Sequence, residues 1–166
     1  MRRTPTIWFC ALAMSTAAVA QMPTLGISAN APICQLPDLM LAWRKPPASL
    51  GTVRERTASD LAGRIEQPYR IQLQPCSTDW CKVGSYAAMV KMDLPQAGRY
   101  RVAVDRMLWI DLYTSAVKLE GLLCEHAGCA PIRKIVQFDV SGGPHWVVLE
   151  RRDAGEVGLM VTRVAP

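Results

Sequence analysis

Two cysteine pairs with the same spacing are the residues of this chain that most clearly could carry chemistry. The first pair, in CSTDWC, is Cys76 and Cys81, and the second, in CEHAGC, is Cys124 and Cys129. Cysteines bind zinc, exchange electrons or form structural disulfides. Zinc pairs are commonly spaced as C-x2-C, and a thioredoxin-type redox site needs C-x-x-C at the start of a helix. The longer C-x4-C spacing therefore favours disulfides.

The first twenty residues have the composition of a secretory signal peptide. Arg2 and Arg3 precede an uncharged apolar run, and Ala18-Val19-Ala20 forms a small-residue cleavage signal. We therefore expect residues 1–20 to be removed and the protein to be periplasmic or secreted. The apolar run is too short to span a bilayer, and no later stretch is long and apolar enough, so we expect no transmembrane segment after signal removal.

Export makes disulfides the default state of the remaining cysteines. We predict the bridges Cys76–Cys81 and Cys124–Cys129, because a tight loop can bring two Cα atoms to the required distance of about 5.5–6 Å. Cys34 is then left over. The sequence does not decide whether Cys34 is free or whether another pairing leaves a different cysteine free.

A metal site is the alternative use of this region. His126 lies inside the second cysteine loop, and His145 is the only other histidine. With Glu125 and the cysteines they could hold zinc or copper. Met89 and Met92 are soft donors, but at strand spacing they point to opposite faces and share no ion. We predict no metal and no cofactor, and keep a periplasmic metal-binding protein as an alternative.

No pattern typical of catalysis is present in the sequence. It has no G-x-S-x-G, H-E-x-x-H or P-loop motif. Ser141 and His145 share one turn without an orienting acid, so we interpret them as part of a solvated hairpin turn. Asp105 and Asp111 are candidates for a glycosidase carboxylate pair, but exposure is the usual state of such acids. The sequence predicts no catalytic residues and a protein that is not an enzyme.

The segment 21–67 is expected to be irregular and in part helical. Its prolines exclude a long helix near its start. The apolar run Leu39–Trp43 can anchor the segment to a core. Apolar residues at multiples of four between Thr52 and Gln67 allow a short amphipathic helix there.

Residues 68–166 are expected to form one β-sandwich domain. Apolar and polar residues alternate with a period of two, and turns such as Ser141-Gly142-Gly143-Pro144 and Asp153-Ala154-Gly155 separate the runs. Short strands at close spacing predict an all-β antiparallel sandwich or jelly roll, with one face of each sheet buried. The expected strands cover residues 69–74, 86–94, 99–104, 108–113, 135–140, 145–150 and 157–164, and a short apolar piece lies around 119–123.

The strand sequences carry a family resemblance. The segments AGRYRVAV, WIDLY and FDVSGGPHWVVLERRDAGEVGLMVTRV resemble the β-sandwich of bacterial pre-peptidase C-terminal domains. Together with CAPIRKIVQF, they also resemble a group of small exported proteobacterial proteins without an assigned function. The resemblance runs from about Tyr69 to the C-terminus. It implies a β-sandwich fold and transfers no catalytic residue.

Charge gives little information about partners. The chain has 19 basic and 14 acidic side chains, a formal charge of +5, and loss of Arg2 and Arg3 would leave 17 minus 14, or +3. The basic residues are scattered, whereas a nucleic-acid surface needs a basic stripe, usually with aromatic residues between the charges. We therefore expect no nucleic-acid partner.

The two cysteine loops supply the candidate binding residues. Asp79 and Trp80 lie in the first loop, and Glu125 and His126 lie in the second. Trp80 either stacks on a ligand or folds back to cap the sandwich, whereas tryptophans in expected strands, such as Trp109, are predicted core residues. The sequence favours a non-catalytic module that recognises an unidentified protein or glycan of the cell envelope. An inhibitor that presents a rigid disulfide loop to an envelope hydrolase is a further alternative.

Overall fold

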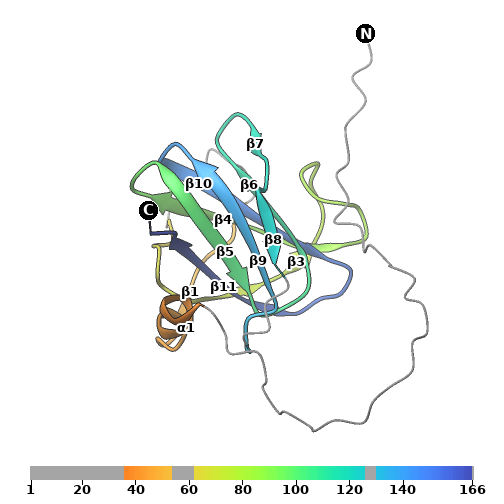
Figure 1. Cartoon of the computed structure of the whole chain (residues 1–166). Helices are drawn as coiled ribbons and strands as arrows, with labels where there is room; N and C mark the ends of the chain where they lie inside the picture. Colours follow the sequence, from red (N-terminus) through yellow and green to blue (C-terminus); the bar gives the residue numbers. More distant parts are fainter. Residues whose placement is uncertain (1–35, 54–61, 126–129, 166) are drawn as a thin grey trace, which may run out of the picture. The chain divides into compact units, whose positions relative to one another are not determined.

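The computed structural model describes residues 36–53, 62–125 and 130–165 of the chain. In these ranges it contains two β-sheets and one short helix, α1 (Pro37–Trp43), which begins at a proline. Residues from both sheets form a shared apolar core, so the sheets pack face to face (Figure 1). The predicted fold class, an all-β sandwich with a part-helical N-terminal segment, is confirmed.

The first sheet has six strands in the order β1-β2-β11-β5-β9-β8. Its pairs are antiparallel except for the short parallel pair of β1 and β2. The strands are β1 (Ala48–Ser49), β2 (Tyr69–Gln72), β5 (Gly98–Val104), β8 (Leu123–Glu125), β9 (Lys134–Val140) and β11 (Glu156–Arg163).

The second sheet has five strands in the order β3-β4-β10-β6-β7, and all of its pairs are antiparallel. Its central strand, β10, pairs along its length with β4 and, over its second half, with β6. The strands are β3 (Gln74–Pro75), β4 (Tyr86–Leu94), β6 (Trp109–Tyr113), β7 (Lys118–Leu119) and β10 (Gly143–Arg151).

The helix expected between Thr52 and Gln67 is wrong for the residues that the structure describes there. Gly63 forms a parallel bridge to Met92, and Glu66 has a positive φ of 59°. The backbone N–H of Val53 donates to the carbonyl of Met89, and the N–H of Gly63 donates to β4 two residues further on. These bonds satisfy backbone groups along the edge of β4 that β3 does not reach, and a helix would leave those groups unpaired.

Burial on both faces of the sheets corrects the expectation of one buried face. On the six-stranded sheet, the outward residues Ala103, Ile135 and Met160 are covered by Leu39 and Ala42 of α1. The run Leu39–Trp43 therefore anchors the N-terminal segment as predicted, but it does so as a helix on the outside of the sandwich.

The outer face of the five-stranded sheet is covered in the same way. Met89 of β4 and Trp146 and Val148 of β10 form a small apolar cluster there, away from the core between the sheets. Val53 and Trp80 pack onto this cluster from two different loops. Met92 belongs to the main core instead, so the prediction that Met89 and Met92 point to opposite faces is confirmed.

The helix cover gives a stability prediction with an internal control. Leu39 is 2% exposed and Leu41 is 67% exposed, although both are leucines of the same seven-residue helix. Leu39→Ala is expected to reduce the free energy of unfolding by about 2–5 kcal/mol, because it removes packing against the sheet. Leu41→Ala should change it by less than about 0.5 kcal/mol. Urea denaturation measures both, and equal effects would contradict the role given to α1.

Candidate functional site

Strand direction brings several loops to one end of the sandwich, which we call the disulfide end (Figure 1). Tyr86 at the start of β4 pairs with Arg151 at the end of β10, and Trp109 at the start of β6 pairs with Glu150. In the other sheet, β5 ends and β9 begins beside them, since residues 105–108 join β5 to β6 directly. The described segments at this end are 76–85, 105–108, 130–133 and 152–155.

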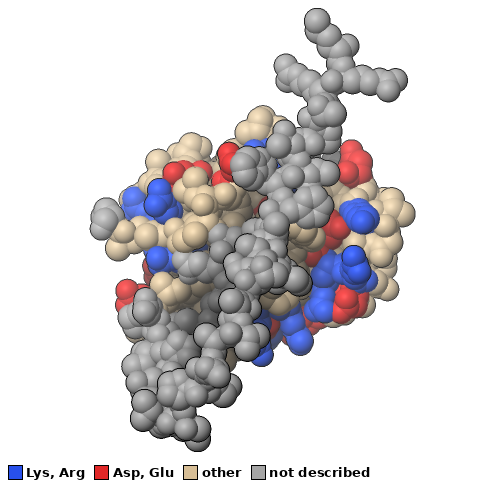
Figure 2. Space-filling model, turned by 45° about the vertical axis from the view of Figure 1, so that its right-hand side comes forward, with Lys and Arg blue, Asp and Glu red and all other residues tan. Residues whose placement is uncertain are grey.

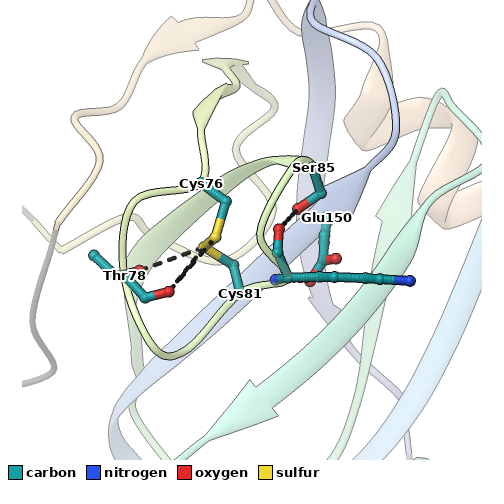
Figure 3. Close-up of a disulfide and its surroundings, with 6 residues drawn as sticks. Cys76, Thr78, Cys81, Ser85 and Glu150 are labelled. Atoms are coloured by element: carbon teal, nitrogen blue, oxygen red, sulfur yellow. Dashed lines mark hydrogen bonds between the residues drawn. A yellow bond between two sulfur atoms is a disulfide. The ribbon is translucent and has the colours of Figure 1, made fainter.

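The disulfide between Cys76 and Cys81 is confirmed, with its Cα atoms 5.9 Å apart. Just after the bridge, the backbone N–H of Lys82 donates to Oε2 of Glu150 on β10 at 3.3 Å (Figure 3). The Ser85 hydroxyl donates to the carbonyl of Lys82 at 2.7 Å. The bridge and these bonds tie the first cysteine loop to the outer face of the five-stranded sheet.

The two predicted binding residues of this loop differ in their surroundings. Asp79 is exposed. Trp80 is half-buried and packs against the outer cluster of Met89, Trp146 and Val148. Because the indole covers apolar sheet surface, the contacts of Trp80 support a packing role.

The second cysteine loop lies largely outside the described residues. His126 and the predicted bridge from Cys124 to Cys129 fall there, and the side chain of Glu125 is not described. The backbone of Glu125 ends β8, the edge strand of the six-stranded sheet. β3 is the edge strand of the other sheet and continues directly from β2, so β3 and β8 end at opposite edges of the sandwich and at the same end.

Trp109 is the residue of this end that the sequence did not identify. It was expected in the core, but 52% of it is exposed. It is the first residue of β6, and its pairing with Glu150 directs both side chains to the outer face of the sheet. Alternation with the buried residues Ile110 and Leu112 was a usable signal, because it assigns Trp109 to the other face.

Lys134 of β9 holds this tryptophan from the opposite sheet. Its Nζ lies 5.2 Å from the centroid of the Trp109 ring and donates to the Leu108 carbonyl at 2.9 Å. The Lys134 side chain is buried. A cation over an indole contributes about 2 kcal/mol when desolvated, so these contacts fix the ring at the end of the sandwich.

His145 is buried inside the sandwich, so the expected solvated turn is wrong for this residue. Its Nδ1 lies 3.0 Å from the carbonyl oxygen of Gly143, and its Nε2 has no hydrogen-bond partner among the residues that the structure describes. Ser141 is exposed. Among the residues that the structure describes, no three His, Cys, Asp or Glu side chains are grouped so that they could hold a metal ion.

Asp105 is also more buried than expected. One of its oxygens lies 2.7 Å from Arg70, and the other accepts the backbone N–H of Gly158 at 2.8 Å. These bonds connect the end of β5 to the adjacent strand β11 and to β2 beyond it, which is a structural role. Asp111 lies on the outer face of β6 and pairs with Lys118 at 2.7 Å.

Comparisons with models of known protein families and with curated proteins find no match to this chain. In the described ranges, no helix has the length and hydropathy that crossing a bilayer requires.

The contacts of Trp80 predict a loss of stability when its indole is removed. Trp80→Ala should reduce the free energy of unfolding by about 2 kcal/mol, roughly half the cost for a fully buried tryptophan. Val83→Ala is the matched control, because Val83 stands in the same loop and is 88% exposed. Thermal and urea unfolding of the two variants should separate them clearly. A Trp80→Ala protein as stable as the Val83→Ala protein would rule out packing as the role of this indole.

Proposed function

We propose that the protein is an exported, non-catalytic binding module that recognises a component of the cell envelope through the disulfide end. The observation that carries this proposal is the half-exposed indole of Trp109, which Lys134 holds in place. An aromatic side chain that is already fixed loses little conformational freedom on binding. Exposed tryptophans in rigid surroundings are common anchors of recognition surfaces.

The loops around Trp109 support the same function. Binding residues concentrate in loops that a rigid scaffold positions. The first cysteine loop is closed by a disulfide and bonded to Glu150, the cross-strand neighbour of Trp109. A partner that contacts both would meet a surface that is already ordered.

The charge distribution supports a partner that is not recognised by one dominant charge. On the face shown in Figure 2, basic and acidic side chains are interspersed. Several of the described charged side chains form ion pairs, such as Arg99 with Asp139 at 3.1 Å. The signal-peptide pattern of residues 1–20 supports export.

The proposed function predicts specific binding to envelopes. The mature protein, carrying a fluorescent label, is mixed with washed envelopes of a Gram-negative bacterium, and bound protein is measured after sedimentation. Saturable binding is expected, and Trp109→Ala should weaken it about tenfold or more, as expected when an interface loses its anchor. Trp109→Phe, which keeps an aromatic ring, should bind with an affinity between those of the unmodified protein and Trp109→Ala.

Leu41→Ala is the control variant, because Leu41 is exposed on α1 and lies outside the proposed surface. It should bind like the unmodified protein. Saturable binding that Trp109→Ala and Leu41→Ala leave equally strong would place the binding surface elsewhere. The absence of saturable binding would contradict the proposed function itself.

A further inference from the structure

Two carboxylates flank the exposed tryptophan on the same face of the sheet. Glu150 lies directly across from Trp109 on the neighbouring strand. Asp111 follows Trp109 by two residues, so it points to the same side of β6 and lies across from Val148. On the outer face, the indole of Trp109 therefore has one carboxylate beside it on the neighbouring strand and another on its own strand.

Both carboxylates are held in place by the protein and still have capacity to accept hydrogen bonds. Oε2 of Glu150 accepts the N–H of Lys82, and Oδ1 of Asp111 pairs with Lys118. An ionised carboxylate has about four acceptor sites in total, so one bond to each leaves room for donors from a ligand. A ligand at this site would need an apolar face for the indole and hydroxyl or amide donors at its rim.

Exposed apolar surface around Trp109 is limited. Among the described residues, Val83 and Met107 are the other large exposed apolar side chains at the disulfide end. A stable protein interface buries about 800 Å² on each partner around an apolar, well-packed centre. An indole bordered by charged groups suits a smaller ligand that has both an apolar face and polar groups. The remaining exposed apolar side chains lie on α1, in the turn between β6 and β7, and at β8: Leu41, Val117, Leu122 and Leu123.

We infer that Trp109, Glu150 and Asp111 form a saccharide subsite for a β-linked pyranose of glucose or N-acetylglucosamine configuration. Such a ring carries its axial C–H groups on its two faces and its hydroxyl or acetamido groups at its rim. A C–H face stacks on the Trp109 indole, and rim O–H or N–H groups donate to the two carboxylates. The same carboxylates disfavour an anionic polysaccharide. This inference rests on the proposed function and specifies its ligand as a glycan.

The test measures binding of defined oligosaccharides by tryptophan fluorescence and isothermal titration calorimetry. Chitohexaose and cellohexaose are the probes, and oligogalacturonate is the anionic control. At least one of the two probes should bind saturably, and oligogalacturonate should bind at least about tenfold more weakly, or not at all. Trp109→Ala should weaken probe binding about tenfold or more, which corresponds to the loss of a binding anchor.

Two milder variants keep the test decisive if Trp109→Ala is poorly folded. Trp109→Phe should retain part of the affinity. Glu150→Gln should weaken binding several-fold while its remaining amide oxygen still accepts the Lys82 N–H. Leu41→Ala should bind like the unmodified protein. Wild-type affinity in both Trp109→Phe and Glu150→Gln would overturn the assigned subsite.

The envelope experiment separates this inference from the function on which it rests. If neither oligosaccharide binds and protease treatment of the envelopes abolishes Trp109-dependent binding, the partner is a protein and the saccharide subsite is refuted while the proposed function stands. If excess chitohexaose or cellohexaose displaces the labelled protein from the envelopes and protease treatment leaves binding intact, the glycan inference is supported. Failure of both envelope and oligosaccharide binding refutes both proposals.

Discussion

Both sheets of this sandwich are apolar on their outer as well as their inner faces, and the rest of the structure follows from that constraint. A two-layer sandwich buries the inner faces only, so each outer face needs its own cover. Helix α1 covers Ala103, Ile135 and Met160 on one sheet. Val53 and Trp80 cover the cluster around Trp146 on the other. Helix α1, Val53 and the first cysteine loop are therefore structural parts of the fold.

The segments that pack on the outer faces also determine which side chains stay exposed for recognition. The bridged loop lies over the outer cluster and reaches Glu150 through Lys82, but it leaves the neighbouring Trp109 half-exposed. Lys134 fixes that indole from the opposite sheet. An apolar side chain that would be more stable when buried is therefore held exposed to solvent at an ordered end of the molecule. This arrangement is the physical basis of the recognition function that we propose.

Alternation in the sequence predicted most strands because it reports directly on burial. The expected strand 86–94 coincides with β4 (Tyr86–Leu94), and turns with glycine at positive φ mark the hairpin before β10. Periodicity failed in the N-terminal segment, where Gly63 lies against β4 and a Cβ would come within 2.6 Å of the Met92 sulfur. Edge pairing of this kind depends on residues far away in the chain. Trp109 was misassigned for a similar reason, since the type of a residue predicts burial only if the face it occupies is covered.

The reactivities of Trp109 and Trp146 distinguish an indole that is exposed at the disulfide end from one that is covered on the same face of the sheet. The two side chains are 52% and 4% exposed. Limited oxidation of the native protein with N-bromosuccinimide, followed by peptide mass spectrometry, measures the reactivity of each indole. We expect Trp109 to be oxidised early and Trp146 to remain intact until the protein is unfolded. Oxidation of Trp146 as fast as Trp109 in the native protein, or protection of Trp109, would contradict this arrangement.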